Sequence, residues 1–327
     1  MKQRRLGTNG PEVSAIGLGC MAMSEFYGKT DEAAARRVLR TALEQGVTML
    51  DTADTYGLGH NERLIAGVLR EWSGDVCVAT KFGIVRKPGE YKRIISGKPE
   101  YVRQAAEASL QRLGRDIIDL YYIHRIDAEV PIEDTVGAMA DLVQQGKVRW
   151  IGISEPAAET VRRAHAVHPV TAVQTEYSLW TRHVEDRLLP TLRELGIGFV
   201  PYAPLGRGFL TGALDANTLE PDDFRRVMPR AQGENLRHNL GLVERIRPIA
   251  EEKEITLAQL ALAWVLAQGE DIVPIPGTRR LQYLEENIAA TEVRLEPEVV
   301  ETLGAVFSRQ EVRGERYPEA GMAGIDG

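Results

Sequence analysis

The stretch VTMLDTADTYG at residues 47–57 carries the repeating unit from which the fold of this chain can be predicted. Its apolar start, residues 47–50, reads as a buried strand, and a helical pattern begins near Asn61. Asp51 therefore stands where a strand ends, and Tyr56 lies five residues later in the loop. Loops held at strand ends by a rigid scaffold commonly carry binding and catalytic side chains. Taken alone, the stretch is equally compatible with Asp51 capping a turn and Tyr56 packing on the surface. The rest of the chain is needed to choose between this interpretation and a functional one.

Seven more apolar runs repeat this plan, each followed by a loop and then an amphipathic stretch. Between them, Pro99 and Pro131 open helical patterns, and Gly114 and Gly146 end them, which is the usual asymmetry of helix termini. Eight strand–helix alternations without a strong internal boundary predict an α/β protein, a (β/α)8 TIM barrel whose helices cover a parallel sheet. The eight runs are residues 15–18, 47–50, 76–79, 117–123, 148–153, 172–174, 197–200 and 272–275.

An open, doubly wound sheet is the alternative architecture. That fold would more naturally carry a Gly-x-Gly-x-x-Gly turn after its first strand. Here the first run leads into GLGCMA at residues 17–22, which lacks the third glycine at the required position. The sequence therefore favours the closed barrel.

Three segments lie outside the eight strand–helix units of a minimal barrel. We expect these segments and the barrel to form a single domain. Residues 1–15 predict an N-terminal β-hairpin, because two short strand patterns flank an Asn-Gly pair typical of tight turns. Residues 203–253 form a long loop between the seventh and eighth strands and include a helix from about 235 to 253. A loop of that size is usually a lid or a binding element. Residues 291–327 form a C-terminal extension.

The composition narrows the class of protein. The chain has 327 residues and a net charge of −7, which argues against a nucleic-acid binder because such proteins usually carry a basic stripe. Two cysteines provide no disulfide framework, which fits a reducing compartment. The N-terminus lacks the apolar core of a signal peptide, and no run approaches transmembrane length. The histidines lack metal-ligand spacing, so no metal site is expected. We expect a cytoplasmic enzyme.

Three consecutive strands are expected to bring chemistry to one end of the barrel, because active sites of this fold lie at the strands' C-terminal ends. A tyrosine with a pKa of about 10 is a weak acid near neutrality, and the Lys81 ammonium would lower that pKa. Asp51 would keep Lys81 charged, and an imidazole could bind the substrate oxygen or the phenol. Such a set could protonate a carbonyl oxygen while another group delivers hydride to its carbon. The four side chains are Asp51, Tyr56, Lys81 and His124.

This set resembles the Asp/Tyr/Lys/His tetrad of the aldo-keto reductase superfamily, in the expected order, and the similarity runs from the hairpin to about Gly304. It is closest to bacterial and plant members akin to pyridoxal and perakine reductases and to potassium-channel β-subunits. The resemblance implies an NADPH-dependent reductase of a small-molecule carbonyl, in which Tyr56 is the acid and His124 orients the substrate. Two alternatives stay open: a non-catalytic NADPH-binding regulatory subunit, and a Schiff-base aldolase-type barrel that uses Lys81.

The resemblance also implies a cofactor site. Ser154 and Gln174 would bind the nicotinamide carboxamide, although Glu155 replaces the usual asparagine beside Ser154. Tyr202 would stack on the nicotinamide ring. NADPH is favoured over NADH because Arg279, with Arg280, would bind a 2′-phosphate; the alternative is that both arginines are surface charges. The pyrophosphate segment would be Leu205, Gly206, Arg207 and Gly208, and the adenosine-phosphate site Gly277, Thr278, Arg279, Glu286 and Asn287.

Further side chains are expected to shape the floor and walls of the site. Cys20 and Met21 follow the first strand and would line the floor, although core packing explains them equally. Tyr317, in a tail that resembles tails of this branch, is expected to reach the mouth of the site. Aromatic residues are often simply core, but five are placed to wall a substrate pocket: Phe26, Phe82, Tyr177, Trp180 and Tyr317.

Overall fold

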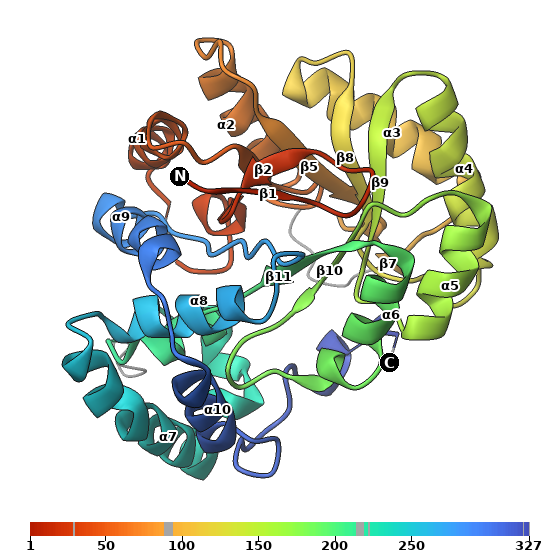
Figure 1. Cartoon of the computed structure of the whole chain (residues 1–327). Coiled ribbons are helices and arrows are strands. Elements are labelled where there is room, and N and C mark those ends of the chain that lie inside the picture. The colour runs from red at the N-terminus through yellow and green to blue at the C-terminus, as the bar shows by residue number, and fades with distance from the viewer. Residues whose placement is uncertain (29, 88–93, 214–218, 222, 323, 327) are drawn as a thin grey trace.

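The computed structural model describes residues 1–28, 30–87, 94–213, 219–221, 223–322 and 324–326. Seven parallel strands form one sheet in the order β11-β10-β9-β8-β5-β4-β3, and helices surround it (Figure 1). Each strand overlaps one of the first seven predicted apolar runs. Their bounds are β3 Leu18–Gly19, β4 Met49–Asp51, β5 Cys77–Phe82, β8 Ile118–Ile123, β9 Val148–Ser154, β10 Ala172–Glu176 and β11 Gly198–Tyr202.

The eighth run closes the barrel through bridges and not through a regular strand. Ile272 pairs in parallel with Phe199 of β11, and Gly277 pairs in parallel with Gly19 of β3. The amides of Val273 and Ile275 donate to the carbonyls of Phe199 and Pro201 (2.9 and 3.0 Å). Pro274 and Pro276 alternate with these residues and lack the N–H groups that would donate toward β3, and this interrupts the ladder. The predicted (β/α)8 TIM barrel is confirmed, although single bridges take the place of a regular eighth strand.

The closure also requires glycine on both sides. A Cβ built on Gly277 would lie 2.9 Å from the carbonyl oxygen of Gly19, and one on Gly19 would lie 2.8 Å from that of Ile275. Backbone atoms cannot yield as a flexible side chain can, so any larger residue here would push the two segments apart.

The helices begin and end largely where the sequence places them. Asp31 caps α1 by accepting from the amides of Ala33 and Ala34 (2.9 and 3.2 Å). Gly114 ends α3 in a left-handed conformation, φ 63°. The barrel helices are α1 Glu32–Glu44, α2 His60–Leu69, α3 Pro99–Leu113, α4 Ile132–Gln144, α5 Ala158–Val167, α6 Leu188–Leu195, α8 Leu257–Ala267 and α9 Leu281–Ala289.

The predicted N-terminal hairpin is present and plugs one end of the barrel. Strand β1 (Gln3–Arg5) pairs antiparallel with β2 (Glu12–Ser14). Leu6 and Val13 are buried in the cluster that fills the barrel interior, together with Val200 and Val273. The connection spans six residues between β1 and β2, so the Asn-Gly pair does not form a two-residue turn. With this end filled, the opposite end remains for a site.

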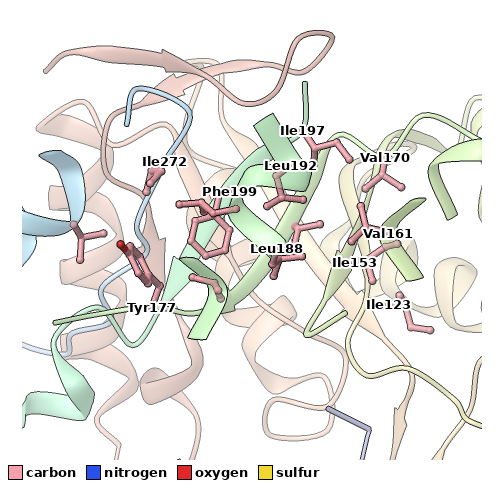
Figure 2. Close-up of a cluster of buried hydrophobic side chains, with 14 of the residues drawn as sticks. Ile123, Ile153, Val161, Val170, Tyr177, Leu188, Leu192, Ile197, Phe199 and Ile272 are labelled. Carbon is pink, nitrogen blue, oxygen red and sulfur yellow. The ribbon is translucent and has the colours of Figure 1, made fainter. Parts of the chain in front are cut away.

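The largest core lies between the sheet and its helices. Figure 2 shows part of it, where Ile153 of β9 and Phe199 of β11 meet Val161 and Leu192 from the surrounding helices. A smaller cluster lies under α1 and α2, around Val38, Leu50 and Ile65. Strands covered in this way are apolar on both faces, which is why they are continuous apolar runs in the sequence.

The two long additions have structure of their own. The predicted helix from about 235 to 253 is α7, Gly233–Glu252, and it lies beside α10, Pro297–Val306, from the C-terminal extension (Figure 1). A two-stranded antiparallel sheet, β6 (Ile84–Val85) with β7 (Ile94–Ile95), follows β5 and was not predicted. The remaining elements are 3-10 helices: η1 Met21–Met23, η2 His183–Glu185, η3 Gly206–Thr211, η5 Phe224–Val227, η6 Pro229–Ala231, η7 Ala290–Glu292 and η8 Glu319–Gly321.

Candidate active site

The four side chains singled out from the sequence lie close together and are nearly buried. Asp51 ends β4 and pairs in register with Ala79 of β5, two residues before Lys81. His124 directly follows β8, and Tyr56 stands in the loop between β4 and α2. Lys81 is 0% exposed, and none of the other three exceeds 8%. The barrel thus collects an acid, an ammonium, an imidazole and a phenol at the C-terminal ends of its strands.

Lys81 and Asp51 form a buried ion pair. The Lys81 Nζ atom donates to Asp51 Oδ1 (2.5 Å) and to the carbonyl of Thr52 (2.7 Å), while Gln174 Nε2 donates to Asp51 Oδ2 (2.7 Å). Burial raises the pKa of Asp51 and lowers the pKa of Lys81, and the attraction between the two charges opposes both changes. Both carboxylate oxygens accept a hydrogen bond, so the pair is held in one orientation.

Tyr56 stands over this pair. The Lys81 Nζ atom lies 5.3 Å from the centroid of the Tyr56 ring, and the His124 ring meets it edge-on with centroids 5.8 Å apart. Burial raises the pKa of Tyr56 well above its ordinary value, and the Asp51 charge raises it further. The pKa of Tyr56 is therefore raised and not lowered as predicted, because burial of the phenol and the charge of Asp51 both favour the protonated form. A phenol in this state keeps its proton at neutral pH.

One large cavity begins at these residues. Its volume is about 1070 Å³, and Asp51, Tyr56 and His124 line it, whereas Lys81 lies behind its wall. A cavity of this size can take a dinucleotide and a small substrate. Most of the predicted cofactor residues line it: Met21, Asp51, Ser154, Gln174, Tyr202, Leu205, Arg207, Gly208, Gly277, Thr278, Arg279, Glu286 and Asn287. Cys20, which is 0% exposed, and Gly206 do not line it.

Arginines gather where the cavity reaches the start of α9. Arg279, Arg280 and Arg225 all line it there. Arg279 donates to the carbonyl of Tyr27 (2.6 Å), and burial together with the charges of Arg225 and Arg280 lowers its pKa. A bound anion would relieve this mutual repulsion, so this part of the cavity suits a phosphate.

The structure corrects the prediction for Arg207. Its guanidinium donates to Glu176 Oε2 (2.9 Å) and stacks on the ring of Tyr317, 4.7 Å from the centroid. The positive charge is thus already compensated by a buried carboxylate. The neighbouring backbone is left-handed at Gly206 and Gly208 (φ 55° and 95°), which glycine adopts without strain and which leaves the chain open to close approach.

Glu155 and the C-terminal tail also form one unit. Glu155 accepts from Arg316 Nη2 (2.7 Å) and from the amide of Glu176 (3.0 Å), so it binds the tail where the family pattern has an amide side chain. Arg316 donates to the Tyr202 hydroxyl (3.2 Å), which is also hydrogen-bonded to the Tyr317 hydroxyl (2.8 Å). Tyr317 lines the cavity, and its role toward a substrate stays a prediction.

The predicted substrate-pocket aromatics divide into two groups. Phe26 and Tyr317 line the cavity, but Phe82, Tyr177 and Trp180 do not, and the prediction for these three is wrong. Phe82 packs on Tyr121 (4.8 Å between centroids), and Trp180 packs on Phe209 (5.7 Å). Tyr177 lies in the core beside Phe199 and Ile272, as Figure 2 shows. Lining residues missed from the sequence include Tyr27, Thr55, Ile84, Arg86, Arg125, Leu219, Phe224 and Arg225.

Two of these missed residues had a signal in the sequence. Arg125 follows His124 directly, so the rule that selected His124 at a strand end also selects its neighbour. Thr55 precedes Tyr56 in the same loop. The others lie in loops or in short elements such as β6 and η5 that the sequence pattern does not specify.

Asp54 lies in the core behind the site and gives a testable dependence of stability on pH. Its Oδ1 atom is buried without a hydrogen-bond partner among the described residues. Burial, followed by the charge of Glu62, raises the pKa of Asp54 to about 8. Because the unfolded pKa is lower, the folded state binds the extra proton, and the resulting stability is lost as pH rises from about 4 through 8. We expect Asp54→Asn to exceed the wild type in unfolding free energy by about 2–5 kcal/mol at pH 9.

Urea unfolding at pH 5, 7 and 9 measures this effect, and exposed Asp116 supplies the matched control variant Asp116→Asn. The control should run parallel to the wild type across the whole series. An Asp54→Asn curve that also runs parallel to the wild type would mean that Asp54 is ionised in the folded protein.

The described residues contain neither a cluster of metal-binding side chains nor a helix that could span a membrane. No group of three or more His, Cys, Asp or Glu side chains in this part of the chain could hold a metal ion. None of the helices in the same ranges has the length and apolar character needed to cross a membrane.

Comparisons with known proteins agree with this geometry. The model described as Aldo/keto reductase family matches residues 15–307. A soybean (Glycine max) protein called probable aldo-keto reductase 1 is 46% identical over 315 residues, covering 96% of this chain and 91% of the relative. The glycerol dehydrogenase AKR11B4 from Gluconobacter oxydans superposes with a TM-score of 0.87 at 27% identity, covering 96% of this chain and 97% of the other. The holo form of aldo-keto reductase AKR11C1 from Bacillus halodurans gives 0.77 at 27% identity, covering 98% and 99%.

The protein is thus a (β/α)8 barrel whose cavity lies at the C-terminal ends of its strands, where enzymes of this fold have their active sites. The family match extends over most of the chain, so the protein belongs to the aldo/keto reductase family. Members of that family are oxidoreductases that act on small-molecule carbonyl compounds and generally use a nicotinamide cofactor.

Proposed function

We propose that this protein reduces an aldehyde or ketone to the alcohol, reversibly, with NADPH as the reductant. The observation that carries the proposal is the shared cavity, which has Tyr56, His124 and Asp51 in one part and an arginine cluster in another. A protonated phenol beside an ion pair can donate to a carbonyl oxygen, and the arginines suit the phosphates of a dinucleotide. A structural neighbour named as a glycerol dehydrogenase is consistent with a reaction that runs in both directions.

The residues present fit a nicotinamide cofactor. Ser154 and Gln174 would hold the carboxamide, since both line the cavity beside Asp51. Tyr202 would face the ring, with its hydroxyl fixed by the tail. The left-handed backbone around Gly206 and Gly208 would lie along the pyrophosphate. When bound, a reduced nicotinamide supplies hydride to a carbonyl carbon.

The protein's own contribution is proton transfer and orientation. Tyr56 holds the proton, because burial keeps its pKa high, and releases it as negative charge develops on the substrate oxygen. The Lys81 ammonium, oriented by Asp51, stabilises the phenolate that remains. His124 would donate to the same substrate oxygen and hold it toward Tyr56.

We propose that Arg279 gives the protein its preference for NADPH over NADH by binding the 2′-phosphate. We expect Arg279→Met to raise KM for NADPH by about 10–100-fold while KM for NADH changes by less than about threefold, because hydrogen bonds to a charged group contribute roughly 1.5–3 kcal/mol. Initial rates with each cofactor measure this. Arg294→Met is the matched control, since Arg294 is exposed and lies outside the cavity. Equal losses with both cofactors would show that Arg279 does not recognise the 2′-phosphate.

The Schiff-base alternative loses its support in this geometry. Lys81 is fully buried, does not line the cavity, and uses its ammonium on Asp51 and the Thr52 carbonyl. A nucleophilic lysine must reach the carbonyl carbon.

An NADPH-oxidation screen over aldehydes, ketones, quinones and pyridoxal, run beside NADH, tests the proposed reaction. Turnover of at least one class is expected. Tight NADPH binding without turnover across the panel would favour the regulatory-subunit alternative. The two free cysteines are both buried, and a cytoplasmic location is part of the proposal because a reducing compartment suits them.

A further inference from the structure

A network of buried charges lies beside the cavity, between the barrel rim and the tail, and Arg125 and Arg207 of this network line the cavity. Two carboxylates, Glu155 and Glu176, are 2% exposed. Three arginines lie within 4.0 Å of one of them: Arg207 with Glu176 at 2.9 Å, Arg316 with Glu155 at 2.7 Å, and Arg230 with Glu176 at 3.9 Å. Burying a charge costs free energy unless the charge is paired, so these ion pairs offset the cost of burying the three arginines.

Arg125 is the exception in this network. It is 6% exposed, and no carboxylate oxygen of the described residues lies within the 4.0 Å of an ion pair. Its Nη1 atom donates to the carbonyl of His124 (2.7 Å) and to Ser154 Oγ (3.4 Å), and its buried Nε atom has no hydrogen-bond partner in the described part of the chain. Four guanidinium groups therefore share two carboxylates, and Arg125 is the group left without one.

Arg125 lies close to the side chains at which we propose that the reaction takes place. Arg125 lines the cavity together with Tyr56, His124 and Ser154. A substrate whose carbonyl oxygen faces Tyr56 would therefore have its substituents close to this guanidinium. A planar guanidinium matches a carboxylate with two parallel hydrogen bonds, and a partly desolvated one binds it more strongly than a neutral group.

We propose that Arg125 recognises a carboxylate on the substrate, so that the preferred substrates are aldehydes or ketones carrying a carboxylic acid group near the carbonyl. The inference rests on the proposed reductase function and adds the substrate class. The ligand carboxylate would supply the direct ion-pair partner that Arg125 lacks among the described residues, where the charge of Glu155 acts on it only from beyond 4.0 Å.

The test compares the 2-, 3- and 4-carboxybenzaldehydes with their methyl esters, which remove the charge and keep the aromatic aldehyde. For the wild type we expect kcat/KM of at least one acid to exceed that of its ester by about tenfold or more. Arg125→Met should lower this acid-to-ester ratio by about 10–100-fold, and Arg125→Lys should restore part of it. Ratios at or below one for all three pairs in the wild type would overturn the inference, as would a ratio that Arg125→Met leaves unchanged.

Arg86 supplies the matched control. It lines the same cavity, but it already donates to both oxygens of Glu25 (2.8 and 2.8 Å). Arg86→Met should keep the acid-to-ester ratio within about twofold of the wild type. Fluorescence titration with NADPH adds a second readout, because a tenfold loss of NADPH affinity in Arg125→Met would assign the residue to the cofactor and reject the substrate role.

Wild-type binding keeps the inference testable even if the variants fold poorly. Calorimetry of the NADPH-loaded protein should show binding of benzoate and little or none of benzamide. If no aldehyde is reduced, only the reductase proposal fails. The comparison of benzoate with benzamide still tests the role of Arg125, because equal binding of the two ligands would show that Arg125 does not recognise a carboxylate.

Discussion

Tyr56→Phe is expected to lower kcat by about 10²–10⁴-fold, the range associated with the loss of a general acid. The substitution removes the hydroxyl and keeps the ring that packs edge-on against His124 and lies over Lys81. The cavity wall should therefore stay intact, and NADPH should bind with an affinity within about threefold of the wild type.

Single-turnover measurements with a reactive aldehyde separate this effect from product release, and NADPH fluorescence titration reports cofactor binding. Tyr101→Phe is a matched control, because Tyr101 is also a partly buried tyrosine near the site but lies outside the cavity. A Tyr56→Phe protein that reduces aldehydes at the wild-type rate would mean that the proton comes from another group.

Lys81→Met is expected to affect both stability and rate. It leaves Asp51 as a buried carboxylate that retains only the hydrogen bond from Gln174 among its two side-chain partners. Removing one partner of a buried ion pair typically costs about 3–5 kcal/mol of unfolding free energy, and kcat should fall as well because the phenolate loses the nearby ammonium. Urea unfolding and steady-state kinetics measure the two effects.

The double variant Asp51→Asn/Lys81→Met distinguishes stability from chemistry. Removing both charges should recover much of the lost stability, since the uncompensated carboxylate is gone, but activity should stay low. Recovery of activity together with stability would indicate that the pair acts only as a structural element.

The sequence predicted the barrel well because burial on both faces leaves a clear pattern. Strands such as β8 and β9 are covered by helices outside and by the barrel interior inside, so they appear as continuous apolar runs. The eighth run was predicted from the same pattern, but its prolines at 274 and 276 remove ladder donors and leave single bridges. The hairpin was predicted as well, whereas its turn length depends on how Leu6 enters the barrel.

The alternation of side chains along a strand could have predicted more accurately which residues face the barrel interior and which face the helices. Lys81 points into the barrel toward Asp51, so its neighbour Phe82 must point outward to the helices, where it packs on Tyr121. Phe82 was thus predictable as core, whereas Tyr177 lies just beyond the end of β10, where alternation gives no guide.

Other features depend on pairs that are distant in sequence. Arg207 meets Glu176 across 31 residues, and Arg316 meets Glu155 across 161. Local patterns carry no information about such pairs, which is why Arg207 was expected to serve a phosphate. The raised pKa of Tyr56 has the same origin, because burial and the Asp51 charge both come from tertiary packing.

We propose that hydride reaches a substrate carbonyl carbon inside this cavity while Tyr56 supplies the proton. Reduction of an aldehyde with NADPH deuterated at C4 of the nicotinamide, followed by mass spectrometry and NMR of the alcohol, tests this proposal directly. We expect an alcohol with one deuterium at the carbinol carbon, formed with one of the two C4 epimers of the labelled cofactor. An alcohol without deuterium from both epimers, or consumption of the aldehyde without oxidation of NADPH, would contradict it.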